Sequence, residues 1–395
     1  MTFAAITPER FPWFDYRHYT FSLGLNLGIK AVLSGHSASV YDLDEGRIVV
    51  RGGMAEQTHT AYDKIEAILD AAGYTLGQVV RIVENVTVAG IDDYAEAEQV
   101  RAQRLGDSNP AVNTVCIDRL LRPAALIEIA VTARRGAEGP VTATSGRLAH
   151  APARAADGVV YLSSVLPVDD FGAVVGDDLY TQTEAAFDRA ERMLVGAGLT
   201  WANVVKTLDY STPATLRDYK ATGRIRKERL GPVYPASAGI LMSRLAHPDA
   251  LIQLDIIAST EPIEAVNPGW DRYAKLTYSP AVRAGNVLFM SGQAALDTET
   301  ERAVHAGDVA AQAEYTYTNI IEVLKAAGAG PEHLVETVEY VTPAGLKRYR
   351  EVAAVRAGLL SAPYPASTGI ICGGLLRPEF EIEVDPLAIL PEPTT

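Results

Sequence analysis

A threefold internal repeat is the feature that most constrains this sequence. Three segments align without gaps: QTHTAYDKIEAILDAAGYTL from Gln57, QTEAAFDRAERMLVGAGLTW from Gln182 and QAEYTYTNIIEVLKAAGAGP from Gln312. Other markers recur at the same offsets of about 125 and 130 residues, namely Gly73, Gly198 and Gly328, and then Pro110, Pro235 and Pro365. Self-similarity at a fixed period marks a repeated structural unit. The chain is therefore predicted to be three copies of one unit of about 125–130 residues.

Each copy predicts the same order of elements, ββαβαββ. Runs rich in β-branched and aromatic residues, such as NVLFM before Ser291, are typical of strands. In the third copy Tyr317, Ile320, Ile321 and Leu324 follow the spacing i, i+3, i+4, i+7 of an amphipathic helix. A strand, a second helix (92–105, 215–230 and 345–360 in the three copies), a Pro-Ala segment and an alternating strand complete the copy. This order indicates an α+β unit whose helices cover one face of a sheet.

Composition narrows the class of protein and of partner. The chain of 395 residues is 48% hydrophobic and has a net charge of −14, which is unfavourable for nucleic acid and for anionic lipid. The N-terminus lacks a signal-peptide pattern and no apolar run could span a bilayer, so a cytoplasmic protein is expected. Two cysteines and seven scattered histidines give no metal-ligand spacing, and there is no Gly-rich phosphate loop. We expect no metal and no cofactor.

The domain boundaries follow from the repeats and from composition. We expect an N-terminal aromatic arm over 1–18, a first unit over 19–135, a second, degenerate unit over 149–260 and a third unit over 273–392. Linkers are expected at 136–148 and 260–272, where charge, Gly and Pro combine. The arm, FPWFDYRHYTF, is taken to have no counterpart in the other copies. We interpret it as an aromatic plug of one end of a barrel, with a substrate lid as the alternative.

Several motifs in this order resemble the Rid/YjgF family of enamine/imine deaminases. They are SGQ, a long helix ending in AAG, a VVKT-like strand, a Pro-Ala segment and a last strand with an inward Glu. The resemblance covers about nine-tenths of the chain. It implies a chorismate-mutase-like unit that forms trimers, with sheets inside, helices outside and active sites between neighbours. Three units in one chain would then form an intramolecular pseudo-trimeric barrel, and the protein would be a monomer or a low oligomer.

The resemblance also implies site positions, which differ among the copies. The family's Tyr position holds Phe21, His150 and Tyr278, and its Glu position is assigned to Glu128, Gln253 and Glu381. Its Arg position holds Val112, Ser237 and Ser367, and its Cys position holds Thr114, Gly239 and Gly369. Because neither Val nor Ser can form a bidentate pair with a substrate carboxylate, another cation must do so or the substrate lacks that group. The candidate cations are Arg17, Arg283 and Arg377.

Candidate roles follow from chemistry. A carboxyl group among Ile and Leu side chains has a raised pKa and can transfer protons, so Glu381 and then Glu128 are the candidate catalytic residues. Gln253 cannot titrate. The candidate substrate-binding residues are Tyr278, Ser291, Gln293, Ser367, Ser34, His36 and Thr114. For the serines, bonding to the backbone is the alternative. For His36 the alternatives are acid/base catalysis and a hydrogen-bonded structural role.

Three functions are compatible with this pattern. The first is a small-molecule enzyme of the Rid type that hydrolyses or tautomerises an imine, enamine or enol ether by acid/base chemistry. The second is chorismatase-like hydrolysis of an enolpyruvyl ether, although that family resembles two such units. The third is a ligand-binding scaffold without catalysis, since every copy lacks the family's Arg.

Overall fold

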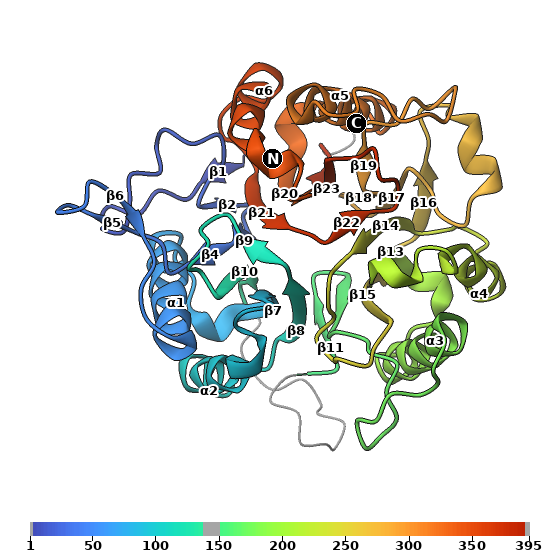
Figure 1. Ribbon diagram of the computed structural model, residues 1–395, viewed down its shortest axis with the longest axis horizontal. Coiled ribbons are helices and arrows are strands. Elements are labelled where there is room, and N and C mark those ends of the chain that lie inside the picture. The colour runs from blue at the N-terminus through green and yellow to red at the C-terminus, as the bar shows by residue number, and fades with distance from the viewer. Residues whose placement is uncertain (1–2, 137–150, 392–395) are drawn as a thin grey trace.

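The computed structural model describes residues 3–136 and 151–391. His150, the start of the predicted second unit and nearly all of the predicted linker at 136–148 lie outside these ranges. Three units surround a common centre, with their helices on the periphery (Figure 1). The predicted α+β organisation in three tandem units is confirmed.

The principal elements of all three units follow the predicted order ββαβαββ. Unit 1 contains β2 (Gly24–Asn26), β3 (Lys30–Leu33), α1 (Met54–Ala71), β7 (Val79–Thr87), α2 (Tyr94–Leu105), β8 (Ala111–Ile117) and β10 (Ile127–Arg134). Unit 2 contains β11 (Ala153–Ala156), β12 (Val159–Leu162), α3 (Leu179–Gly196), β13 (Val204–Ser211), α4 (Thr222–Arg229), β14 (Ala236–Leu241) and β15 (Ile252–Ser259). Unit 3 contains β17 (Ala281–Ala284), β18 (Val287–Met290), α5 (Val309–Ala326), β20 (Leu334–Val341), α6 (Val352–Leu359), β21 (Ala366–Ile371) and β23 (Ile382–Ile389).

Short strands extend this plan in units 1 and 3. They are β1 (Ala4–Ala5), β4 (His36–Ser37), β5 (Val40–Asp42), β6 (Arg47–Val49) and β9 (Arg119–Leu120), followed by β16 (Ile263–Val266), β19 (Gln293–Ala294) and β22 (Gly374–Leu375). The second helices of units 2 and 3 begin later than predicted, because 3-10 turns precede them. The hydroxyl groups of Tyr219 and Tyr349 in these turns donate hydrogen bonds to carboxylates of the preceding strand, Asp209 and Glu339 respectively.

The long helices form for the reasons their sequences give. In α5 the side chain of Asp308 accepts a hydrogen bond from the Ala311 N–H and caps the first turn. Tyr317, Ile320 and Leu324 are fully buried against the sheet, as the helical spacing predicted. The helix ends just before Gly328, whose φ of 74° lies in the left-handed region that favours glycine.

The pairing of the last strand in each unit shows which residue of unit 3 is equivalent to Glu128 and Gln253. In its sheet Glu128 lies opposite Asn85, and Gln253 lies opposite the equivalent Tyr210. The third member of this register is Glu383, which lies opposite Tyr340. The assignment of Glu381 to this register is therefore wrong. The helix repeats carry the offset of 130 residues between copies 2 and 3, and the same offset leads from Gln253 to Glu383, whereas Glu381 precedes the strand.

The units contact one another in a cyclic order. β9 of unit 1 pairs with β21 of unit 3, and β22 of unit 3 pairs with β14 of unit 2. At the third interface Ser243 of unit 2 donates backbone and hydroxyl hydrogen bonds to the carboxylate of Asp118 in unit 1. The strands nevertheless form separate sheets, so the pairing does not confirm the predicted single barrel.

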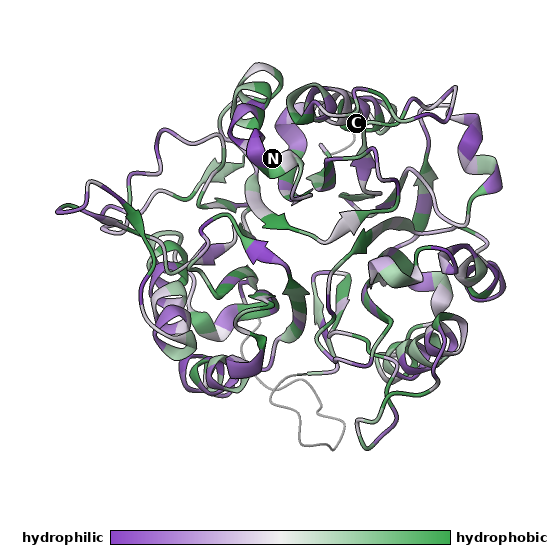
Figure 2. Ribbon diagram, in the orientation of Figure 1, coloured by the Kyte–Doolittle hydropathy of each residue, from purple (hydrophilic) through white to green (hydrophobic). Residues whose placement is uncertain are grey.

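Apolar packing exists at two levels. One cluster lies between the helices and the sheet of each unit. A further cluster contains Val80, Val205 and Val335, which are equivalent residues of the three units. The strands near the centre are largely hydrophobic, and hydrophilic residues gather on the peripheral helices (Figure 2). Among the described residues no helix is both long and apolar enough to cross a membrane.

The aromatic arm has a counterpart, contrary to the expectation from sequence. Residues 12–22 of unit 1 and 269–279 of unit 3 both contain Trp, Tyr, Thr and Ser at matching places, seen in Trp13 and Trp270. Several arm aromatics pack on the core of unit 1, whereas Phe3 of the arm packs against the central cluster that contains Val80, so the barrel plug and the substrate lid both stay predictions. The predicted linker at 260–272 also contains structure, because β16 pairs with β17 and Trp270 is buried.

Candidate functional site

The three unit interfaces share one hydrogen-bonded motif. In unit 3 the Ser291 hydroxyl donates to the Ser279 carbonyl at 2.6 Å and accepts from the Ser237 N–H of unit 2 at 2.8 Å. Ser34 of unit 1 bonds in the same way to the Ser367 N–H of unit 3. The two serines, which were predicted to bind a ligand, thus form hydrogen bonds to the backbone of the neighbouring unit, as in the alternative given for them above.

The cleft between units 2 and 3, here called the 2–3 cleft, contains a cavity of about 310 Å³. Unit 2 contributes residues of its second-helix region and of β14, and unit 3 contributes β19, the start of β23 and the segment before its first strand. Two predicted residues, Tyr278 and Gln293, line this cavity. Ser237, at the family's Arg position, lines it too.

Glu383 is the carboxyl group of this cavity. It lies on β23, is 8% exposed and has no hydrogen-bond or ion-pair partner among the described residues. Burial, together with the negative charge of Asp385, raises the pKa of Glu383 to about 8, although Lys206 opposes the shift. The carboxyl group lies over Gly292, where a Cβ atom would collide with Glu383 Oε1. Glycine in the SGQ motif therefore makes room for this carboxyl group.

Apart from Glu383, the charged residues that line this cavity are cationic. Lys220, Arg272 and Arg377 line it, and apart from Glu383 the described lining contains no acidic side chain. Arg226 also lines it but forms an ion pair with the buried Asp209. Nε of Arg272 is buried without a hydrogen-bond partner. A cavity with these charges favours an anionic ligand, even though the whole chain carries a net charge of −14.

Three tyrosines complete the site. The rings of Tyr273 and Tyr278 meet edge to face with centroids 5.5 Å apart. Burial raises the pKa of Tyr278, and the nearby Arg272 opposes that shift. Tyr219 of unit 2 reaches the same cavity from the opposite unit. All three phenols therefore stay protonated at neutral pH and can donate or accept hydrogen bonds.

The cleft between units 1 and 3 has a different set of groups. Burial raises the pKa of Glu128 to about 7, and Lys64 opposes the shift. Burial lowers the pKa of His36 to about 3, and its Nε2 lies 3.1 Å from the Leu23 carbonyl oxygen. His36 is thus a neutral ring at neutral pH. Phe21 takes the place of Tyr278 and packs on the core of unit 1.

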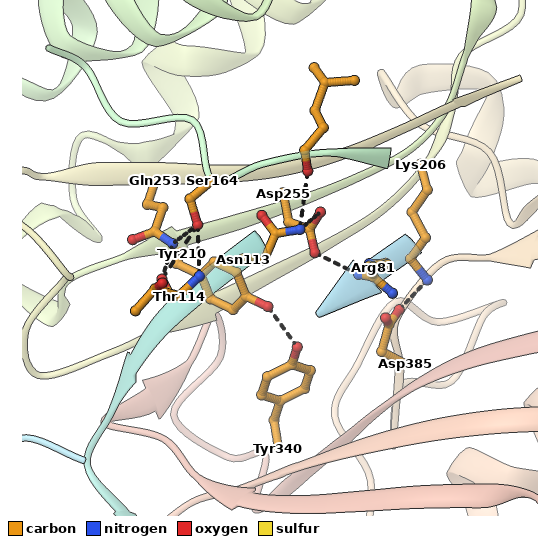
Figure 3. Close-up of polar contacts among 11 residues, drawn as sticks. Arg81, Asn113, Thr114, Ser164, Lys206, Tyr210, Gln253, Asp255, Tyr340 and Asp385 are labelled. Atoms are coloured by element: carbon orange, nitrogen blue, oxygen red, sulfur yellow. Dashed lines mark hydrogen bonds and ion pairs between the residues drawn. The ribbon is translucent and has the colours of Figure 1, made fainter. Parts of the chain in front are cut away.

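The cleft between units 1 and 2 is bridged by hydrogen bonds. The amide of Gln253 donates to the Thr114 carbonyl at 2.7 Å and to the Ser164 hydroxyl at 3.2 Å (Figure 3). The Thr114 N–H donates to the same hydroxyl at 3.0 Å. Thr114, predicted to bind substrate, therefore connects two units here.

Some residues predicted for the site line this cavity and others do not. Glu381 does not line the cavity; its N–H donates a hydrogen bond to Gln312 Oε1 at 2.7 Å. Of the candidate cations Arg377 lines the cavity, whereas Arg17 pairs with Asp15 at the surface and Arg283 bonds the Gly285 carbonyl. Arg272, Tyr273 and Tyr219 were missed. A comparison of residues 269–279 with 12–22 would have revealed the first two as part of a repeated segment.

Comparison with known proteins agrees with this architecture. The family model described as Endoribonuclease L-PSP matches residues 18–135, 142–260 and 271–390. A RutC family protein from Synechocystis sp. is 34% identical over 118 residues, which are 29% of this chain and 86% of that protein. Reactive Intermediate Deaminase A, chloroplastic, from Arabidopsis thaliana is 32% identical over 148 residues, which are 37% of this chain and 78% of that protein.

Two further likenesses differ in extent. A RutC family protein from Pyrococcus horikoshii is 37% identical over 81 residues, 20% of this chain, and the match spans 62% of that relative's length. A chorismatase crystal structure superposes with a TM-score of 0.52 and 14% identity, covering 79% of this chain and 93% of that chain, which shows a shared fold. Because the family model matches all three units, the chain belongs to the Endoribonuclease L-PSP family, the Rid/YjgF family, as three tandem copies.

Proposed function

We propose that the 2–3 cleft hydrolyses an imine or enamine that carries an anionic group. The observation that carries the proposal is the buried, unpartnered Glu383 carboxyl group in a cavity whose other charged lining residues are Lys and Arg, apart from the Asp209-paired Arg226. A general acid needs a pKa near the working pH, and the pKa of Glu383 is raised to about 8. The family relationship supports small-molecule chemistry of this kind.

The reaction proceeds by proton transfers to and from one carboxyl group. Neutral Glu383 donates its proton to the imine nitrogen, or to the terminal carbon of an enamine, which leaves an electrophilic C=N carbon. Water then adds to that carbon as the carboxylate takes up one water proton, which gives a carbinolamine. Glu383 returns this proton to the nitrogen, the C–N bond breaks and ammonia leaves. The carboxylate then takes the hydroxyl proton of the carbinolamine, so that a carbonyl product and neutral Glu383 remain.

The anionic group of the substrate would contact Arg272 and Arg377. Both line the cavity on the unit 3 side, whereas the family's Arg position on β14 is Ser237. A guanidinium binds a carboxylate with two parallel hydrogen bonds, and an Arg272 Nε without a partner has donor capacity for one. In this proposal the residues that bind the substrate carboxylate belong to unit 3, whereas the family's Arg position belongs to unit 2.

Hydrolysis of an enolpyruvyl ether is the second candidate. The likeness to a chorismatase over 79% of this chain favours it at the level of the fold. In this reaction Glu383 would protonate the terminal enol carbon and water would add to the ether carbon, releasing pyruvate and an alcohol. The same carboxyl group would serve both reactions.

Release of product distinguishes the candidates. Ammonia release is measured with 2-imino acids generated in situ by an L-amino-acid oxidase, and pyruvate release is measured with chorismate. We expect acceleration of the first reaction, lost in Glu383→Gln and retained in the control Glu381→Gln, whose position lies outside the cavity. Pyruvate release alone would favour the second candidate. If neither reaction is accelerated, the enzymatic proposal is contradicted, and a ligand-binding scaffold without catalysis is the function that remains.

A further inference from the structure

A tyrosine of unit 2 occupies the space that a side chain would fill in β14. Position 239 is glycine, and a Cβ atom there would lie 2.8 Å from the Tyr219 hydroxyl oxygen and 2.8 Å from Leu376 Cδ1. The phenol therefore stands in the place where a side chain at 239 would enter the cavity. It lines the same cavity as Glu383, which belongs to the other unit.

The Tyr219 hydroxyl has a fixed orientation. It donates its proton to Asp209 Oδ2 at 2.8 Å, and Asp209 is buried and ion-paired with Arg226. The guanidinium also lies over the Tyr219 ring, 5.3 Å from the centroid, and its Nη2 donates a hydrogen bond of 3.5 Å to the hydroxyl oxygen. Because the hydroxyl donates to Asp209 and accepts from Arg226, one oxygen lone pair is left for another donor.

The equivalent tyrosine of unit 3 repeats this arrangement in another cleft, since a Cβ atom at Gly369 would lie 2.8 Å from the Tyr349 hydroxyl oxygen, whereas the tyrosine of unit 1 differs. In unit 1 the Tyr94 hydroxyl bonds Glu84, Arg101 and also Thr114 Oγ1 at 2.6 Å, so its hydrogen-bonding capacity is used. In unit 3 Tyr349 bonds the buried Glu339 and faces the cleft between units 1 and 3. Only at Tyr219, among these three, does the hydroxyl line the cavity that contains Glu383.

We infer that Tyr219 is the positioning residue of this site, a fixed hydrogen-bond acceptor that binds an N–H group of the ligand. The inference rests on the proposed function and extends it. Glu383 protonates the substrate and the arginines face its anionic group, while Tyr219 offers the acceptor that a protonated imine or amine nitrogen requires. A ligand with a keto oxygen in place of the nitrogen gains nothing from Tyr219.

Two ligands that differ at this atom provide the test. L-Phenylalanine and phenylpyruvate share a carboxylate and an aromatic ring, and calorimetric titration measures each Kd for wild type and for Tyr219→Phe. The variant keeps the ring and loses only the hydroxyl. We expect binding of phenylalanine to weaken roughly 3- to 10-fold, the usual effect of one hydrogen bond, and binding of phenylpyruvate to stay within about twofold.

The matched control is Tyr349→Phe, which removes the equivalent hydroxyl from unit 3 and should change neither Kd. For an imine substrate Tyr219→Phe should raise KM while kcat is retained, a change that a loss of stability would not produce. Equal effects of Tyr219→Phe on both ligands, or no effect on either, would overturn the role of Tyr219. If wild type binds neither ligand, the anionic, nitrogen-bearing substrate is wrong and the inference falls with it. Selective binding without turnover would support Tyr219 and contradict only the proposed reaction.

Discussion

At the residue scale, two carboxylates two positions apart have opposite surroundings. Glu383 is buried at the cavity, and Glu381 lies half-exposed at the strand entrance. The surroundings of Glu383 raise its pKa to about 8, which makes this carboxyl group a proton donor at neutral pH. The turnover of wild type should therefore fall above about pH 8, where Glu383 loses its proton. A pH profile of kcat measures this, and a flat profile from pH 7 to 10 would contradict the assignment.

The same group should make stability depend on pH. Its pKa is raised from 4.5 to about 8 in the folded state, so between these values the folded chain holds a proton that the unfolded chain lacks. The free energy of unfolding should thus decrease by at most ~4 kcal/mol as pH rises from 5 to 8. This decrease should be absent in Glu383→Gln. Chemical unfolding at several pH values measures it. Glu381→Gln serves as the control, and a parallel pH dependence in wild type and Glu383→Gln would refute the assigned environment.

At the scale of elements, the segment before the first strand distinguishes one cleft from another. Residues 269–279 place Arg272 at the 2–3 cleft, and the matching position in residues 12–22 is Asp15. Asp15 pairs instead with Arg17 at the surface. This one position therefore carries opposite charges in units 1 and 3, and under the proposed function the positive charge suits one cleft to an anionic ligand.

Reversing that charge tests the role of the segment. Arg272→Asp should weaken binding of phenylpyruvate by about 10- to 100-fold, since the charge-assisted hydrogen bonds disappear and a negative charge faces the carboxylate. Arg283→Asp, on a neighbouring strand and outside the cavity lining, is the control and should bind normally. Calorimetric titration gives both values. Unchanged binding in Arg272→Asp would assign the anion to Arg377 or Lys220.

The sequence alone predicts the order of the helices and strands, but it does not predict which side chains surround each site residue. The repeats predicted ββαβαββ, the long helices and the glycines that end them, because these depend on local spacing and backbone conformation. The site needed information from two units: Tyr219 and Glu383 belong to different copies and meet only in the folded ring. The sequence pattern assigns Glu381 to the family's Glu position because alternation alone does not fix register, whereas pairing with Tyr340 places Glu383 there.

At the scale of the whole molecule, the three interfaces differ in their side-chain contacts. The cleft between units 1 and 2 is bridged by Gln253, while the 2–3 cleft keeps a cavity. Tandem fusion permits this, because each copy can change without altering the other two. Since the cyclic contacts are already made within one chain, light scattering should give the mass of a single chain. A particle of three chains would contradict this prediction.

Buried ion pairs along the centre are specific to each interface. Arg81 of unit 1 pairs with Asp255 of unit 2 at 2.8 Å, and Lys206 of unit 2 pairs with Asp385 of unit 3 (Figure 3). The third equivalent pair would join Glu336 to Ala130 and cannot form an ion pair. Burial raises the pKa of Glu336, which has no ion pair with any described residue. The unit 1–2 and unit 2–3 interfaces thus have electrostatic partners that the unit 3–1 interface lacks.

Removing one of these partners should lower the free energy of unfolding. Arg81→Met leaves Asp255 buried with the Asn113 amide as its remaining side-chain hydrogen-bond donor among the described residues, which should cost ~3–5 kcal/mol at pH 7. Arg224→Met removes the exposed pair with Glu228 and should change stability by less than ~1 kcal/mol. Urea unfolding of wild type and the two variants at pH 7 measures these differences. A deficit of Arg81→Met no larger than that of Arg224→Met would contradict a stabilising role of the buried pair at the interface between units 1 and 2.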